Sequence, residues 1–357
     1  MDSKTNKPKI LLINKNQFGY HTDYYKFCEY LKDEFDITFL CFYLNYELLE
    51  MEGIEVVYVP YKGHYVLRGI MFLIIAIKKI FFHRGLVFIN YFEKCELLKK
   101  IFPNKKMILD IRTLAVNNDP VVRKREDESL KETCKIFDHV TIISEGIQEK
   151  LKLSDSKCSL IPLGSDCISN CDKVFINLNL IYVGTLSGRN ISQTVLGLKI
   201  FINNNPKVKI SYDIIGDGID FEIIKNLVND LNLGKIVKMH GRIPHFKLKP
   251  FFDNSNVGVS YVPITDYYQY QPPTKTYEYI NSGMICIATN TYENKKIISS
   301  QNGVLCNDSP ESFADSLEYI SQHLNIYNSK TIKTTLLNNN WSNIVDGSLK
   351  TVLNKFF

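Results

Sequence analysis

The sequence is 357 residues long, which is more than one ordinary hydrophobic core requires and suits two domains of roughly 150 to 180 residues each. Apolar residues make up 45% of the chain and charged residues 23%, which excludes a disordered or fibrous protein. The net charge of +5 favours anionic ligands or an anionic membrane surface, and it is too weak to indicate nucleic acid, which we do not expect as a partner. Nine cysteines without a Cys-x-x-Cys pair indicate reduced thiols in a cytoplasm rather than a zinc ribbon or a disulfide framework.

The first half of the chain alternates short apolar runs with helical patterns. Strands are predicted at 9–13, 37–42, 55–60, 86–90, 107–111, 139–144 and 159–162, with helices between most of them. Such alternation is typical of a mainly parallel sheet that is covered by helices on both faces. Ligands of these sheets bind beyond the carboxyl ends of the strands, so candidate residues are sought there.

For two places at these strand ends, the sequence allows both a functional and a structural interpretation. Asp110 and Arg112, in the stretch ILDIRT, are either ligand residues or a structural ion pair at the end of a strand. Gly19 lies in a loop where the backbone passes close to something, which is either a ligand or a neighbouring strand. All three residues are therefore candidates.

The continuous apolar stretch at 69–77 ends at two lysines, well short of the about 20 residues that span a bilayer. We interpret it as a buried helix of the α/β layer in preference to an element that lies on a membrane. Peripheral contact with an anionic membrane is a second hypothesis, because basic residues surround the stretch, namely Arg68, Lys78, Lys79, His83 and Arg84. The amino-terminal residues lack the apolar core of a secretory signal, which again indicates the cytoplasm.

A polar stretch at 163–179 interrupts the alternation and predicts a boundary between a first domain at 1–170 and a second at 171–330. The second series again alternates strands and helices, so a second parallel sheet is predicted. Residues 331–357 contain a helical pattern with no strand to follow. This segment is predicted to pack outside the second domain and to return to the first.

The stretch QPPTKTYEYINSGMICIAT at 271–289 has the features of a short helix followed by a strand. Pro272 and Pro273 suit the first helical positions, because their fixed φ and missing N–H cost nothing there. Gly283 suits the left-handed cap that ends a helix.

The start of this predicted helix is the strongest candidate site. The unpaired N–H groups of Thr274, Lys275 and Thr276 and the positive end of the helix dipole predict an anion site, to which Lys275 adds a full charge. Glu278, one turn further, would be repelled by a phosphate but suits the hydroxyls of a ribose next to it. A nucleoside diphosphate would satisfy both, although Lys and Glu in the first turns are also favourable for capping and dipole reasons alone.

Several ordered motifs resemble the GT-B glycosyltransferases and, more narrowly, the retaining family-four glycosyltransferases of bacterial polysaccharide assembly. The matching stretches are YVGTLSGRN at 182–190, DIIGDG at 213–218, MHGRIP at 239–244, PPTKTYEYINSGMICIAT at 272–289 and NG at 302–303. In the first domain, ILDIRT, TIISEGI and IPLGSD are similar less specifically. The resemblance implies an α/β fold in which two Rossmann-like domains face a central cleft and close on the donor.

The resemblance also implies roles for individual residues. Arg189 and Lys275 would neutralise the donor diphosphate, and Glu278 would hold the ribose. The backbone around Arg242 and Ile243 would meet the base, and Gly19 would let its loop approach the donor sugar or the acceptor. The candidate catalytic residues are Arg189, Lys275, Glu278 and Asp110. The candidate substrate-binding residues are Gly19, Arg112, Gly184, Thr185, Gly216, Asp217, Arg242, Ile243, Thr274 and Thr276.

Fixed positive charges aimed at the departing diphosphate would stabilise the transition state, so no metal and no cofactor is expected beyond the nucleotide sugar itself. The leading hypothesis is a glycosyltransferase that passes a sugar, with retention, to a saccharide or lipid-linked acceptor in bacterial surface-glycan synthesis. It would act in the cytoplasm or on the inner face of the cell membrane. Tyr270 and Thr185 depart from the family pattern, which has a Glu and an Arg there. The alternatives are a GT-B nucleotide-sugar epimerase and a non-catalytic binding subunit.

Overall fold

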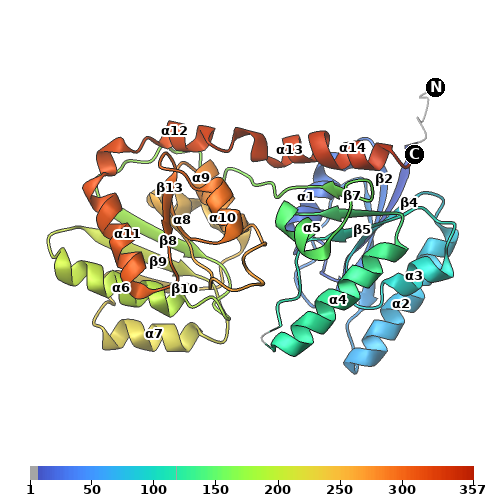
Figure 1. The fold of residues 1–357 in the computed structure, drawn as a ribbon, viewed down its shortest axis with the longest axis horizontal. Coiled ribbons are helices and arrows are strands. Elements are labelled where there is room, and N and C mark those ends of the chain that lie inside the picture. The colour runs from blue at the N-terminus through green and yellow to red at the C-terminus, as the bar shows by residue number, and fades with distance from the viewer. Residues whose placement is uncertain (1–6, 118) are drawn as a thin grey trace. The chain divides into compact units, whose positions relative to one another are not determined.

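The computed structural model describes residues 7–117 and 119–357; residues 1–6, on which part of the expectation for the amino terminus rests, lie outside the described residues. The chain divides into two compact units, the first made of Met1–Leu163 and Trp341–Phe357 and the second of Gly164–Asn340 (Figure 1). Each unit contains one sheet in which every pair of neighbouring strands is parallel, which confirms the predicted α/β fold class. No helix in the described part of the chain is long and apolar enough to cross a membrane.

The first unit has a seven-stranded sheet in the order β3-β2-β1-β4-β5-β6-β7. Its strands are β1 (Lys9–Ile13), β2 (Asp36–Tyr43), β3 (Ile54–Pro60), β4 (Leu86–Asn90), β5 (Met107–Ile111), β6 (His139–Ile142) and β7 (Cys158–Leu160). The central strands β4 and β5 are almost wholly buried, because helices cover both faces of the sheet. This burial explains why their sequences are continuous apolar runs rather than alternating ones.

Five helices follow the strands of the first unit in sequence. They are α1 (Thr22–Leu31), α2 (Tyr65–Phe82), α3 (Glu96–Ile101), α4 (Pro120–Ile136) and α5 (Glu145–Leu151). The helices α2, α3 and α4 pack side by side (Figure 1). Side chains cap three of the starts. His64 accepts a hydrogen bond from the N–H of Val66, Asp119 accepts one from Val121, and Ser144 accepts one from Ile147.

The segment Trp341–Phe357 belongs to the first unit, where it forms α13 (Trp341–Ile344), a π-helical turn (Val345–Leu349) and α14 (Lys350–Asn354). The ring of Trp341 is buried and lies 6.0 Å from that of Phe27 in α1. Lys350 pairs with Glu34, and the ring of Phe356 lies 5.8 Å from that of His139. The aromatic contacts give this segment a place in the core of the first unit.

The second unit has a six-stranded sheet in the order β10-β9-β8-β11-β12-β13. The strands are β8 (Leu178–Val183), β9 (Ile210–Ile215), β10 (Val237–Gly241), β11 (Val257–Ser260), β12 (Ile285–Thr289) and β13 (Gly303–Cys306). The helices are α6 (Ile191–Asn204), α7 (Phe221–Asp230), α8 (Lys249–Asn254), α9 (Thr274–Asn281), α10 (Tyr292–Ile297), α11 (Pro310–Gln322) and α12 (Ser329–Thr334), with a 3₁₀ turn η1 at His245–Lys247. Helix α6 packs between α7 and α11, and α9 packs against β11 and β12 (Figure 1).

One expectation about burial is wrong. The apolar stretch at 69–77 lies in α2 as predicted, but this helix is not buried on all sides. Only Phe72, Ala76 and Ile80 are buried, while Leu67, Ile74 and Phe81 are among its exposed residues. A helix that covers a sheet needs only one apolar stripe, so the remaining apolar surface of α2 has no structural cause within the first unit.

Candidate functional site

The candidate site of the second unit lies where the strand order of its sheet reverses. Strands β8 and β11 are neighbours, and the chain proceeds from β8 toward one edge of the sheet and from β11 toward the other. The loop at 184–190 follows β8, and the segment that leads into α9 follows β11. In parallel sheets, ligands bind beyond the carboxyl ends of the strands at this kind of switch point.

A pocket of about 450 Å³ lies beyond the carboxyl ends of three adjacent strands, β8, β9 and β10. Its lining consists of Val183, Gly184, Thr185, Ile215, Gly216, Asp217, Gly218, Arg242 and Ile243. The structure thus brings together six of the residues that the sequence predicts as substrate-binding, from three separate loops. Backbone makes up much of this wall, because three of the nine positions are glycine and three more directly follow a glycine.

The pocket depends on close packing between two glycines. The N–H of Gly184 donates to Ile215 O at 3.0 Å, and the N–H of Gly216 donates to Gly241 O at 2.8 Å. A Cβ atom at Gly216 would lie 1.8 Å from the carbonyl oxygen of Gly184, and φ at Gly216 is 153°. No other residue fits there without separating the two loops.

Hydrogen bonds hold the loop after β8 against the loop after β9. Leu186 N–H donates to Asp217 O at 3.0 Å, and Ile219 N–H donates to the hydroxyl of Ser187 at 3.1 Å. The hydroxyl of Tyr182 donates to Thr185 O at 2.7 Å. The loop is therefore fixed before any ligand binds, which lowers the entropic cost of binding.

Helix α9 begins two residues later than the sequence suggests. It starts at Thr274, and Pro273 is the N-cap residue with φ −74° and ψ 119°, so both prolines precede the helix. Gly283 has φ 74°, which confirms the left-handed position after the helix. The N–H groups of Thr274 and Lys275 have no hydrogen-bond partner among the described residues, so two donors are available to an anion.

Thr276 does not contribute to this anion site. Its N–H donates to Pro273 O at 3.0 Å, and its buried hydroxyl is bonded to Ser260 at 2.6 Å and to Asn294 at 3.0 Å. Both polar groups of Thr276 are thus used inside the second unit. The expectation that Thr276 binds substrate is corrected by this geometry, since a one-residue step along a helix turns a side chain by about 100°.

Lys275 lies beside Gly184, one of the residues that line the pocket. Its Nζ atom is 4.2 Å from the centre of the Tyr182 ring and 2.8 Å from the place that a Cβ atom of Gly184 would occupy. Burial and then the charge of Arg189 lower the pKa of Lys275 to about 7, and Glu278 opposes this shift. The ammonium is held by an aromatic face and not by a carboxylate, so an anionic ligand would supply the missing counter-charge.

Arg189 and Glu278 are close enough to Lys275 to influence its pKa, so the three candidates form one group. The guanidinium of Arg189 lies 4.3 Å from the centre of the Tyr268 ring. Glu278 is 13% exposed at its side chain, and its Oε1 lies 3.4 Å from Nε2 of His245. Tyr182 and His245 were not candidates from the sequence, because only the fold brings them beside residues about 30 to 90 positions away.

The lowered pKa of Lys275 predicts a pH-dependent affinity for diphosphates. Above about pH 7 the free ammonium loses its proton, and a bound diphosphate has to restore it. The dissociation constant of a nucleoside diphosphate should therefore rise roughly twentyfold between about pH 7.5 and about pH 9, where the phosphate groups are already ionised. Isothermal titration calorimetry checks this, and Lys275→Arg, which keeps its charge, should remove the slope. An equal slope in both proteins would contradict the assignment.

Asp110 and Arg112 form a buried network inside the first unit. Asp110 is 0% exposed and accepts hydrogen bonds from the hydroxyls of Tyr24 at 3.0 Å and Thr141 at 2.7 Å. Arg112 pairs with Asp23 at 2.9 Å and with Asp110 at 3.4 Å, and it donates to Ile161 O. Of the two interpretations, these contacts favour the structural ion pair, and the catalytic role of Asp110 and the substrate-binding role of Arg112 stay predictions.

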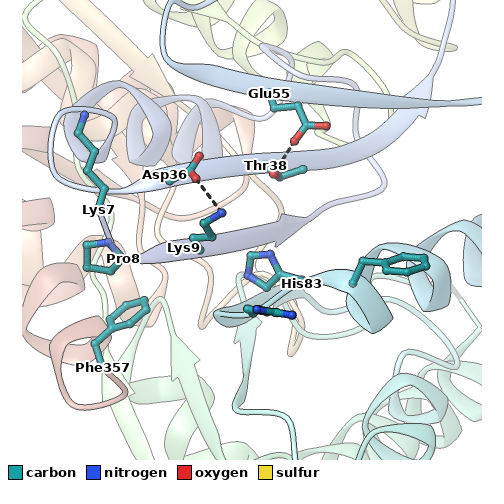
Figure 2. A pocket seen from close by; sticks show the side chains of 10 residues that line it. Lys7, Pro8, Lys9, Asp36, Thr38, Glu55, His83 and Phe357 are labelled. Carbon is teal, nitrogen blue, oxygen red and sulfur yellow. Dashed lines mark hydrogen bonds and ion pairs between the residues drawn. The ribbon is translucent and has the colours of Figure 1, made fainter. Parts of the chain in front are cut away.

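Two other places in the described part of the first unit are Gly19 and a pocket at the ends of the strands. Gly19 has φ 88°, and a Cβ atom there would lie 2.3 Å from the side chain of Leu49, so its close neighbour is another loop. A pocket of about 730 Å³ lies at the amino ends of β1 and β2 (Figure 2). Lys9 pairs there with Asp36 at 3.6 Å, and ligands of parallel sheets bind at the opposite edge.

One known protein family matches most of the second unit. Residues 177–323 match the family described as Glycosyl transferases group 1. The matched stretch contains the pocket, the loop after β8 and helix α9. No curated protein sequence matched the chain.

Solved structures resemble the whole chain. Sucrose-phosphate synthase from Thermosynechococcus elongatus has a TM-score of 0.79 at 15% identity, covering 98% of this chain and 99% of that chain. The Anabaena protein HepE, in complex with UDP and glucose, has a TM-score of 0.75 at 10% identity, covering 98% and 100%. The lipopolysaccharide outer core galactosyltransferase WaaB in its apo form has a TM-score of 0.67 at 15% identity, covering 96% and 99%. At these identities the likeness confirms the GT-B fold.

Proposed function

We propose, from the premise that residues 177–323 form a group 1 glycosyl transferase domain in a GT-B glycosyltransferase, that this chain transfers a sugar from a nucleoside-diphosphate donor to a saccharide or lipid-linked acceptor. The observation that carries the proposal is the position of Lys275. Its ammonium lies beside Gly184 and has no carboxylate partner among the described residues, and the same helix start offers two N–H donors that are unpaired there. These groups suit a diphosphate on which negative charge grows as the bond to the sugar breaks.

The finer parts of the proposal follow the family resemblance. The reaction retains the anomeric configuration, needs no metal because Arg189 and Lys275 supply the positive charge, and takes place in the cytoplasm, peripherally on the inner membrane face, in the synthesis of a bacterial surface glycan. The likeness to HepE, which was solved with UDP-glucose, supports UDP as the first nucleotide to test.

A thermal-shift screen of UDP, GDP, ADP and CMP and their sugars tests the proposal. One nucleoside diphosphate should stabilise the protein, and its labelled sugar should appear in a glycoside when acceptors are offered. Release of an epimerised sugar without an acceptor would identify an epimerase instead. Binding of no nucleotide by calorimetry would favour the non-catalytic subunit.

Glu278 offers a sharper test of how the nucleotide lies. Glu278→Gln should weaken the binding of the preferred nucleoside diphosphate about tenfold, because a carboxylate that accepts ribose hydroxyl bonds is lost. Binding of inorganic pyrophosphate, which has no ribose, should remain or become slightly tighter. Competition titrations with both ligands measure the difference.

Glu222→Gln is the matched control for this substitution. Glu222 is an exposed glutamate in α7 that pairs with Lys225 at 3.7 Å, outside the pocket lining. Glu222→Gln should change neither the affinity for the nucleoside diphosphate nor the affinity for pyrophosphate. If Glu278→Gln weakened pyrophosphate and nucleoside diphosphate equally, the ribose contact would be refuted.

A further inference from the structure

Helix α2 is apolar around most of its circumference but is buried on one side only. Its buried residues Phe72, Ala76 and Ile80 recur at four-residue spacing, and the ring of Phe72 lies 4.5 Å from that of Phe42 in β2. The opposite side carries Leu67, Ile70, Ile74 and Phe81, which are 63%, 48%, 60% and 65% exposed. We call these four residues, together with Lys78 between them, the α2 face. A helix on a sheet in water normally has polar residues there.

The charges around the α2 face have one sign. Residues 61–84 contain no Asp or Glu and five cations, namely Lys62, Arg68, Lys78, Lys79 and Arg84. Lys79 pairs with Glu55 at 3.0 Å, but Lys78 is exposed and has no ion-pair partner among the described residues. Lys78 lies on the α2 face itself, four residues after Ile74 and three before Phe81. The surface is therefore both apolar and cationic.

The neighbouring helix α3 packs beside α2 and exposes Leu97 and Ile101 together with Lys100, while Glu96 stands in its first turn. Exposed apolar patches on soluble domains mark interaction sites.

We propose that the α2 face docks onto an anionic lipid bilayer, with the helix lying along the membrane surface. Leu67, Ile70, Ile74 and Phe81 would enter the boundary between head groups and acyl chains, as amphipathic interfacial helices do. Lys78 would extend its stem through this layer and place its ammonium among lipid phosphates. This docking deepens the membrane location proposed above and is independent of the sugar transfer.

Charge complementarity favours the bilayer over a second copy of this chain. In a symmetric dimer across the α2 face, each copy would bring Lys78 and the neighbouring cations, and residues 61–84 offer no carboxylate to pair with them. Burying these ammonium groups unpaired would cost more than the apolar contact supplies. An anionic membrane supplies the apolar layer and the counter-charges together.

Vesicle flotation of the full chain tests the inference. The protein should float with vesicles of phosphatidylcholine and about 30% phosphatidylglycerol, and much less with phosphatidylcholine alone. The double variant Ile70→Gln, Ile74→Gln should lower the bound fraction at least tenfold, and Lys78→Glu should lower it by roughly tenfold. Because these side chains are exposed, all variants should keep the parent's melting temperature.

Ile223→Gln is the matched control, since Ile223 is an isoleucine in α7 that is 62% exposed. This variant should float like the parent protein. Equal flotation with zwitterionic and anionic vesicles, no flotation at all, or unchanged flotation of the double variant would overturn the inference. The inference would also be overturned if analytical ultracentrifugation showed a dimer of the parent protein that is absent in the double variant. Nucleotide stabilisation, measured on the same samples, reports separately on the proposed transferase.

Discussion

Replacing Lys275 with methionine is expected to lower turnover of the donor about ten- to a thousandfold and, at the same time, to stabilise the fold. The loss follows because the ammonium beside Gly184 is a fixed charge for the leaving diphosphate. The gain follows because the pKa of Lys275 is lowered to about 7, so the folded protein holds fewer protons than the unfolded chain between that pH and the ordinary lysine value. The buried ammonium of Lys275 therefore lowers the free energy of unfolding near neutral pH, and this loss disappears as the pH rises and the group gives up its proton. Methionine has no charge, so the loss is absent at every pH.

Methionine is suited to this position because it is unbranched like lysine and makes favourable contacts with aromatic rings such as that of Tyr182. The expected gain is about 1–2 kcal/mol in the free energy of unfolding. Thermal melts with and without the nucleoside diphosphate measure stability and binding, and transfer of the labelled sugar measures turnover. Lys225→Met, at an exposed position in α7, serves as the control. A Lys275→Met protein that is less stable, or that still binds the diphosphate with parental affinity, would contradict the assigned role.

Replacing Asp110 with alanine is expected to cost about 3 kcal/mol of stability, which corresponds to a fall of roughly 10 °C in the melting temperature of the first unit. The substitution leaves Arg112 buried with one of its two carboxylates missing, and it removes the acceptor of the Tyr24 and Thr141 hydroxyls. Nucleoside diphosphate binding in the second unit should be unchanged. Calorimetric melts combined with nucleotide titration separate the two properties.

Asp36→Ala is the comparison for Asp110→Ala. Asp36 also pairs with a cation, Lys9, but both side chains are more than half exposed, so the cost should stay below about 1 kcal/mol. If Asp110→Asn abolished turnover while leaving stability intact, Asp110 would return as a catalytic residue.

Much of the fold is predictable because the buried strands have little freedom in sequence. The predicted ranges of β1, β4 and β5 agree with the observed ones, since a strand that is covered on both faces must be apolar throughout. The boundary between the units is less predictable. The polar stretch after Leu163 belongs to the second unit, where Ser165 bonds with Asn281 and the hydroxyl of Ser169 donates to Asp253. Side-chain bonds over such separations leave no local signal.

The candidate site, like the fold, is predictable from the sequence only in part. Glycines and the short motifs around Gly184, Gly216 and Arg242 predicted the pocket, because close backbone packing restricts the residue type. Which side of α9 faces inward was not predictable, so Thr276 was expected in the site although it is bonded internally. Burial was also misjudged for α2, because an apolar composition does not show how much of a helix its neighbours cover.

The first unit is assembled from two stretches of chain, with the whole of the second unit between them. During synthesis on the ribosome, its sheet emerges early, but Trp341, which packs against Phe27, emerges only after the second unit is complete. The second unit can fold as one continuous piece, whereas the nascent first unit waits with part of its core uncovered. Chaperones that shield apolar surface would therefore be needed mainly by the half of the protein that is made first.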